Sequence, residues 1–271
     1  MKSVLLHIHD DQGAESRLQA ACDLARGCKA HIQCVQVRSA PDLVAADMYG
    51  GGAFAPVITE ELREIDDRLR VQVEDRLRRE GVSWDWRQVD GETVGALLRA
   101  AKLSDIIVAT LPEGPRKDFK DPLPIVSDLA LGGRTPVLAM PQSAKCFKMP
   151  GRALVAWDGS HEAASAIKAA IPLLQRTQDV HVVTVEETDK REFPSTEVPE
   201  YLSRHAIPAQ MHSWSRDGEA VETALLGAIS ALAADWVVMG AFGHSRLREL
   251  VFGGVTRRML RDARIPLLLA H

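Results

Sequence analysis

The chain has 271 residues, of which 46% are hydrophobic, and its formal net charge is −4 at pH 7. At about 100–200 residues per domain, this length predicts one large domain or two medium ones. The charge does not favour a nucleic-acid partner, and without an apolar run of about 18 residues we expect no membrane span. The four cysteines form no Cys-x-x-Cys pair, so we expect free thiols in a cytoplasmic protein.

The first part of the chain alternates apolar runs with segments of helical periodicity. Runs such as "DIIVAT" are apolar throughout, which is typical of parallel strands buried on both faces. A long charged helix is expected over residues 60–79, after a glycine-rich loop at residues 50–52. The expected strands are residues 4–9, 31–37, 83–89, 106–109 and 137–139.

The second part of the chain follows the same order of elements. A segment without periodicity separates the parts, and it predicts domains at residues 1–143 and 150–271. The expected strands of the second domain are residues 153–157, 180–185, 209–214, 236–239 and 266–269. Its helices are expected to begin near Ser160, Thr196, Glu219 and Val255.

Matching residues indicate that the two parts are a tandem duplication. The tripeptide Asp-Gly-Glu at residues 90–92 matches that at residues 217–219, and Asp105 matches Asp235. The sequence therefore predicts two tandem α/β domains, each a doubly wound, Rossmann-like, five-stranded parallel sheet, related by a pseudo-twofold axis. Their final strands are apolar edge strands that need covering, so we expect them at the interface of a pseudo-dimer within one chain. Further association into a homodimer stays open.

Four glycines follow the apolar run at residues 236–239, namely Gly240, Gly243, Gly253 and Gly254. In an open α/β sheet, ligands bind beyond the carboxyl ends of the strands, and a glycine lets the backbone come close to them. A helix beginning after Gly253 would direct free N–H groups and its dipole towards an anion. The same glycines also suit tight turns, so their spacing alone leaves turns and phosphate binding as open alternatives.

The spacing Gly240-x-x-Gly243, nine residues, Gly253, followed by Val255 and Thr256, resembles the ATP-binding signature of universal stress proteins. Asp158, at the end of the first strand of this part, is similar to the family's acidic residue near the adenine. The resemblance covers both parts of the chain. It implies a tandem universal stress protein that binds an adenine nucleotide, ATP with or without magnesium, in a regulatory or stress-response role.

The resemblance also implies which residues contact the nucleotide. Residues at the strand ends would hold the adenine and the ribose, and the glycine stretch would hold the phosphates. Gly254 departs from the family, which has Ser or Thr there, and Phe242 stands where some members have His. The implied contacts are Trp157, Asp158, Val185, Met239, Gly240, Phe242, Gly243, Gly253, Gly254, Val255 and Thr256.

The first part has lost this signature. Thr110 and Glu113 stand in place of the first two glycines, and Leu123 and Pro124 in place of the last two. Pro124 has no N–H to donate, and Glu113 would repel phosphate. We therefore expect at most one ATP per chain, held by the C-terminal part.

Two other functions stay open. One is a nucleotide-independent scaffold for an unknown protein partner, and the other is a slow ATPase, for which Glu249 is the one nearby acid. No catalytic set and no metal-ligating set is recognisable, and His7 and His9 are read as packed histidines in preference to a metal pair. Four arginines flank the phosphate loops, and about half of them should face solvent. They are Arg246, Arg248, Arg257 and Arg258.

Overall fold

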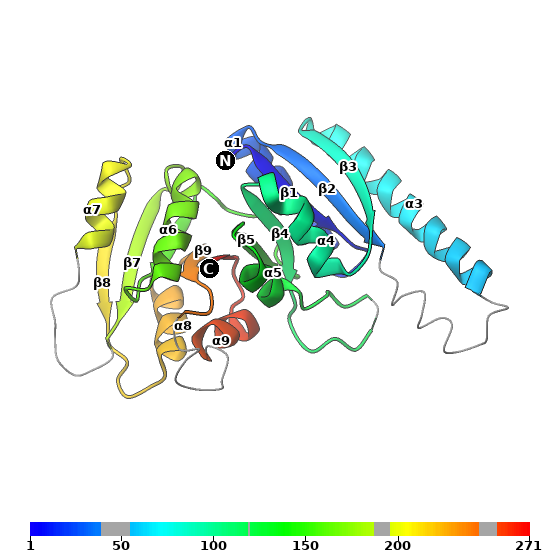
Figure 1. Ribbon diagram of the computed structural model, residues 1–271. Coiled ribbons are helices and arrows are strands. Elements are labelled where there is room, and N and C mark those ends of the chain that lie inside the picture. Colours follow the sequence, from blue (N-terminus) through cyan, green and yellow to red (C-terminus); the bar gives the residue numbers. More distant parts are fainter. Residues whose placement is uncertain (39–54, 119, 187–195, 244–253) are drawn as a thin grey trace.

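The structure, a computed structural model, describes residues 1–38, 55–118, 120–186, 196–243 and 254–271 (Figure 1). The strands are β1 (Ser3–Ile8), β2 (His31–Arg38), β3 (Ser83–Asp90), β4 (Ile106–Leu111), β5 (Val137–Pro141), β6 (Arg152–Ala156), β7 (Asp179–Val185), β8 (Gln210–Trp214), β9 (Trp236–Gly240) and β10 (Leu267–Ala270). The helices are α1 (Ala14–Cys28), α3 (Ala55–Glu80), α4 (Thr93–Ala100), α5 (Val126–Gly132), α6 (His161–Leu174), α7 (Glu197–Arg204), α8 (Val221–Ala231) and α9 (Gly254–Asp262), with a 3-10 turn, η1, at Ala101–Leu103.

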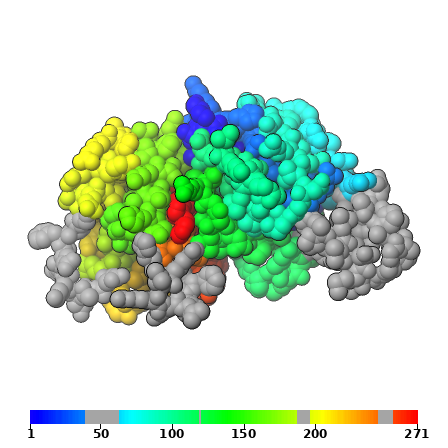
Figure 2. Space-filling view, in the orientation of Figure 1, coloured from blue at the N-terminus to red at the C-terminus, as the bar shows by residue number. Residues whose placement is uncertain are grey.

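The strands form one sheet of ten, in the order β3-β2-β1-β4-β5-β10-β9-β6-β7-β8. Pairs within each half are parallel, and the halves join where β5 and β10 pair antiparallel, with Leu138 opposite Leu268. The C-terminal residues, red in Figure 2, accordingly lie between the two halves. The expectation that the final strands meet at the interface is confirmed, and both lie at the centre of a continuous sheet.

Each half repeats the same strand order. Counted from the outer edge, the first half runs 3-2-1-4-5 and the second runs 8-7-6-9-10, which is the same order advanced by five strands. Helices α1, α3, α6 and α7 contribute to one hydrophobic cluster, and α4, α5, α8 and α9 contribute to another. Neighbouring residues Leu5 and Leu6 of β1 are both buried and belong to different clusters. The predicted α/β class, with helices on both faces of parallel five-stranded units, is confirmed.

The matched aspartates have matched roles. The Asp105 carboxylate accepts hydrogen bonds from the backbone N–H groups of Lys2 and Ser3, where β1 begins. The Asp235 carboxylate accepts one from the N–H of Arg152, the first residue of β6, at 2.9 Å. Each aspartate therefore ties the start of one central strand to the start of its neighbour, which explains why both halves contain it.

Most element boundaries agree with the sequence to within a few residues. Helix α6 begins one residue after Ser160, whose hydroxyl caps it by accepting from Ala163 N at 3.1 Å. The charged helix expected at residues 60–79 extends over Ala55–Glu80, and it projects beyond β3 at one end of the molecule (Figure 1). The glycine-rich loop at residues 50–52 lies outside the described residues. No helix in the described part of the chain is both long and apolar enough to cross a membrane.

Two histidines on neighbouring strands make the stability sensitive to pH. Nδ1 of His181 and Nε2 of His212 lie 3.0 Å apart. Burial, and then the neighbouring His181, lowers the pKa of His212. An unfolded histidine titrates near pH 6.5, so below that pH the unfolded chain binds more protons than the folded one.

We therefore expect the contribution of His212 to stability to be complete above about pH 6.5 and to be lost as the pH falls below it. His212→Gln keeps an amide beside His181 and removes this titration. Urea unfolding at pH values on either side of about 6.5 should give a smaller loss of unfolding free energy in the variant. An unchanged pH slope would contradict the assignment.

Candidate functional site

A cleft of about 530 Å³ opens in the second half, within the usual range of about 300–1,000 Å³ for small-molecule sites. It lies at the carboxyl ends of β6, β7 and β9 and beside the first turns of α6, α8 and α9. Its floor includes the apolar side chains of Val183, Val185, Leu225 and Met239. This is the part of a parallel sheet at which ligands of open α/β folds bind.

Nine of the residues proposed from the sequence line this cleft. They are Trp157, Asp158, Val185, Met239, Gly240, Gly243, Gly254, Val255 and Thr256. The side chain of Phe242 instead packs in the hydrophobic core, where the residue is 5% exposed. Gly253 lies outside the described residues. The structure thus brings together residues from four separated segments of the second half.

The two ends of the glycine stretch are joined by a hydrogen bond. The N–H of Phe242 donates to the hydroxyl of Thr256 at 3.2 Å, and Thr256 is buried in the first turns of α9. This contact fixes the end of β9 against the start of α9. Gly243 and Gly254 consequently border the same cleft, although ten residues of sequence lie between them.

Glycine is required at position 240 because the end of β9 lies very close to the first turn of α6. A Cβ at this position would lie 2.6 Å from Ala163 N and 2.8 Å from the carbonyl carbon of Glu162. The first turn of α6 therefore packs directly on the end of β9.

Gly240→Ala is expected to destabilise the protein by about 1–3 kcal/mol, because the added methyl group meets backbone atoms that cannot move away cheaply. Urea unfolding would measure the loss, and Gly254→Ala is the matched control, since Gly254 has no atom within 4 Å of its Cβ position among the described residues. Equal stability of the two variants would contradict the packing argument.

The described lining of the cleft is acidic. Asp158, Glu162 and Glu222 line it, and within the described part of the chain no Lys or Arg does. Arg257 lines a different groove, between the two halves, and Arg258 forms an ion pair with Asp262. Arg246, Arg248 and Glu249 lie outside the described residues.

Glu162 was not identified from the sequence. The residue is only 9% exposed, and among the described residues its buried Oε2 has no hydrogen-bond partner. The same oxygen lies 3.4 Å from the Cβ position of Gly243. A signal was present, because Glu162 stands four and eight residues before the buried Ala166 and Ala170, on the apolar face of α6.

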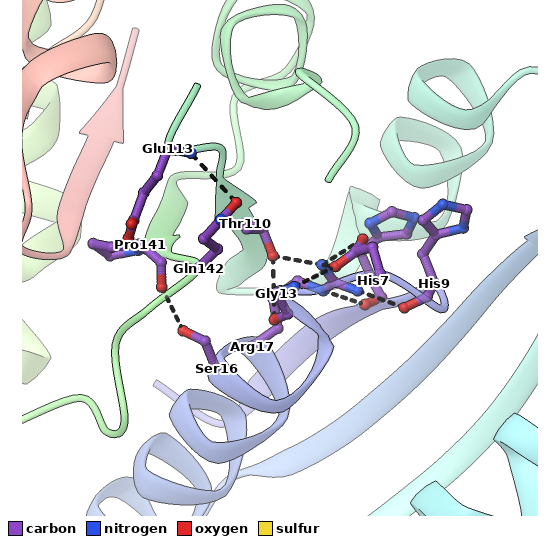
Figure 3. Close-up of polar contacts among 10 residues, drawn as sticks. His7, His9, Gly13, Ser16, Arg17, Thr110, Glu113, Pro141 and Gln142 are labelled. Atoms are coloured by element: carbon purple, nitrogen blue, oxygen red, sulfur yellow. Dashed lines mark hydrogen bonds and ion pairs between the residues drawn. The ribbon is translucent and has the colours of Figure 1, made fainter. Parts of the chain in front are cut away.

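The corresponding end of the first half contains a network of polar contacts within the protein (Figure 3). The guanidinium of Arg17 donates to both carboxylate oxygens of Asp11, at 2.8 and 2.9 Å, and to the hydroxyl of Thr110. It also donates to the backbone carbonyl oxygens of His7 and His9. Arg17 is 1% exposed, so this network is buried at the carboxyl ends of β1 and β4.

The close contact that Gly240 makes has a counterpart in the first half, in which the glycine lies at the start of the helix and not on the strand. Thr110 holds the matching position on β4, and the glycine is on the other side of the contact. A Cβ on Gly13 would lie 2.5 Å from Thr110 Oγ1. Glu113, which replaces the second glycine, accepts hydrogen bonds from the backbone N–H and the hydroxyl of Ser143. Thr110 and Glu113, which stand in place of the glycines, thus form contacts within the first half.

His7, in β1, and His9, which follows the strand, pack against each other. The rings of His7 and His9 stack with centroids 5.8 Å apart and an interplanar angle of 7°. Burial, followed by the charge of Arg17, lowers the pKa of His7 well below its usual value. His7 is therefore neutral near pH 7.

Comparison with known proteins identifies the second half. Residues 149–271 match the sequence model of the Universal stress protein family, so this segment is a domain of that family. No curated protein matches the chain in sequence. A universal stress protein from Archaeoglobus fulgidus DSM 4304 resembles the structure with a TM-score of 0.76 and 15% identity, over 99% of this chain and 97% of that chain.

Two further solved structures share the architecture. A candidate universal stress protein from Pseudomonas aeruginosa UCBPP-PA14 gives a TM-score of 0.62 and 17% identity, over 100% of this chain and 93% of that chain. A protein of unknown function from Pseudomonas aeruginosa PAO1 gives 0.60 and 16%, over 100% and 92%. At these identities the similarity shows a common fold.

Proposed function

We propose, from the universal stress protein domain at residues 149–271, that the protein binds an adenine nucleotide in its second half and has a regulatory or stress-response role. ATP is the proposed ligand, at most one per chain, and it acts as a ligand and not as a rapidly consumed substrate. Trp157, Asp158 and Val185 would contact the base and the ribose. Met239, Gly240 and Gly243 would border the ribose and the first phosphates, and Gly254, Val255 and Thr256 the outer phosphates.

One observation carries this proposal. Nine of the residues proposed from the sequence line a single cleft at the carboxyl ends of β6, β7 and β9. The cleft has an apolar floor for a base at the ends of β7 and β9, and it borders the first turn of α9. A helix start offers unpaired N–H groups and a positive dipole end to phosphate. An apolar pocket beside an anion-binding helix end suits a nucleotide.

The buried ion pair in the first half supports a single nucleotide site per chain. Its counterpart region contains the Arg17 and Asp11 ion pair, with Thr110 where the second half has Gly240. A nucleotide could enter there only by displacing a buried, hydrogen-bonded charge pair, which costs several kcal/mol. We therefore propose that residues 1–143 form a degenerate domain of the same fold and that residues 150–271 form the binding domain.

Two measurements on the full chain test the proposal. Mass spectrometry of protein purified without added nucleotide should detect a bound adenine nucleotide, and calorimetry with ATP should give a stoichiometry near one. Two equivalent sites would overturn the single-site proposal. No binding of ATP, ADP or AMP would favour the nucleotide-independent scaffold, and steady phosphate release would favour the slow ATPase.

The proposed cellular compartment rests on the state of the cysteines. Cys22, Cys28 and Cys34 are buried free thiols, and Cys146 is an exposed one. Unpaired thiols are typical of proteins from a reducing compartment. We propose a cytoplasmic protein that acts through a protein partner.

Gly254→Ser is expected to tighten ATP binding more than AMP binding. Gly254 does not have a positive φ, and no described atom lies within 4 Å of its Cβ position, so serine fits without strain. A hydrogen bond to a charged group contributes about 1.5–3 kcal/mol, which corresponds to a gain of about tenfold or more in affinity. AMP lacks the outer phosphates and should bind the variant and the wild type alike.

Calorimetry with both nucleotides, at one magnesium and salt concentration, measures this difference. Gly254→Ala is the control, because it adds the same Cβ without a hydroxyl. Equal gains for ATP and AMP would show that the outer phosphates lie elsewhere.

A further inference from the structure

A second groove lies where α6 of the second half meets the first half, and we call it the α6 groove. Residues just before β4 and β5 form one side of it, and the later turns of α6 form the other. Among the described residues, none lines both this groove and the cleft. Its volume of about 410 Å³ falls within the usual range of about 300–1,000 Å³ for small-molecule sites. The groove is therefore a separate place with room for a ligand.

Three cationic side chains from separate segments of the chain line the α6 groove. Lys102 belongs to η1, Arg134 stands shortly before β5, and Lys168 lies on α6. All three residues are exposed, and none of their side chains forms a hydrogen bond or an ion pair with another described residue. The fold thus gathers positive charge from both halves at one place, although the chain as a whole has a net charge of −4.

The groove supplies little negative charge to offset these cations. Asp105 is the one carboxylate among its described lining residues. That carboxylate already accepts hydrogen bonds from the backbone N–H groups of Lys2 and Ser3. The hydroxyl of Ser104, which also lines the groove, has no hydrogen-bond partner among the described residues. Three cations and one hydroxyl donor are therefore available to an anionic ligand.

Helix ends explain only two of the three cations. Lys102 lies in the last turn of η1 and Arg134 follows α5, where a cation interacts favourably with the negative end of a helix. Lys168 lies in the middle of α6, far from either end. An acid three or four residues away could pair with it along the helix. Those positions hold Ala164, Ser165, Ile171 and Pro172.

We propose that the α6 groove binds a small anion with two or more linked phosphate groups, which bridges the two halves of the chain. Lysine ammonium groups and the arginine guanidinium form strong, charge-assisted hydrogen bonds to phosphate oxygens. No aromatic side chain is among the described lining residues, so a base would find no stacking surface there. The site is distinct from the proposed nucleotide site and does not depend on it.

Calorimetry with sodium pyrophosphate tests the proposal on the full chain, without divalent cations and at constant ionic strength. We expect Lys168→Gln and Arg134→Gln each to weaken pyrophosphate binding by about tenfold, because each removes a charge-assisted hydrogen bond. Orthophosphate should bind the wild type at least about tenfold more weakly than pyrophosphate, since it offers fewer charged oxygens. A higher salt concentration should weaken both, because the cations are exposed.

Two further variants are controls. Lys145→Gln removes an exposed lysine that does not line the groove, so pyrophosphate should bind it as it binds the wild type. Gly243→Asp places a carboxylate in the cleft and should leave one pyrophosphate site per chain. Thermal melting of each variant shows whether it is folded, which separates lost binding from lost structure.

Four results would overturn the proposal. If Gly243→Asp abolishes pyrophosphate binding and Lys168→Gln does not change it, the anion lies in the cleft. Equal weakening by Lys145→Gln and Lys168→Gln would show a diffuse effect of net charge and no site. Orthophosphate binding as tightly as pyrophosphate would contradict the requirement for linked phosphates. The absence of pyrophosphate binding to the wild type would contradict the site itself.

Discussion

Replacing Gly243 with aspartate is expected to abolish ATP binding. The new carboxylate would enter the cleft beside Glu162, whose Oε2 lies 3.4 Å from the Cβ position of Gly243. It would place both bulk and negative charge where the first phosphates are proposed to lie. Like charges brought together at an interface cost several kcal/mol, so the affinity should fall by about 100-fold or more.

The variant should still fold, because the Cβ of residue 243 meets only side-chain atoms, at ordinary contact distances. Gly243→Asn has nearly the same size without the charge, and an intermediate affinity is expected for it. Calorimetry at one magnesium and salt concentration measures all three proteins. If Gly243→Asp binds ATP as well as the wild type does, the glycine stretch is only a set of turns and the proposed function fails.

Removing Arg17 is expected to cause the largest loss of stability. Arg17→Met leaves Asp11, whose side chain is 1% exposed, without its cationic partner. Breaking a buried ion pair from one side costs about 3–5 kcal/mol. The hydroxyl of Thr110 and the carbonyl groups of His7 and His9 also lose a donor. At about 2–4 °C per kcal/mol, the melting temperature should fall by roughly 6–20 °C.

A double variant distinguishes the loss of the ion pair from the cost of leaving the Asp11 carboxylate buried without a cationic partner. Arg17→Met combined with Asp11→Asn removes both charges, so the protein should be more stable than with Arg17→Met alone. Urea unfolding would measure the free energies, and ATP binding by the second half should be unchanged in every variant that folds. A double variant as unstable as the single one would show that packing, and not charge, dominates at this position.

Much of the fold was predictable because it depends on local patterns. Continuous apolar runs predicted buried parallel strands such as β4 and β9, and the capping residue Ser160 marked the start of α6. The matched pair Asp105 and Asp235 revealed the repeated order of elements. The antiparallel pairing of β5 with β10 into one sheet was not predicted in detail, because two apolar edge strands can be covered by pairing or by packing.

The site was predictable only in part. The glycine spacing identified a set of residues that the structure places around one cleft, and their role in binding stays a prediction. Phe242 has a φ of 56°, and its side chain turns into the core, which spacing alone does not reveal. Arg17 and Glu162 were missed because each is a charged residue on a helix, and such residues usually face solvent. Only the tertiary structure shows that both are buried.

Because β5 and β10 join two halves of one polypeptide, the two halves can differ in sequence. Both strands belong to one polypeptide, so the two halves meet at a fixed ratio of one to one, whatever the concentration of the protein. The two subunits of a homodimer cannot differ in sequence in this way, because every substitution in the gene alters both subunits at once. Here the first half contains the buried Arg17 network, and the second half contains the cleft. A single gene thereby encodes two halves with the same strand order whose strand ends differ in their residues.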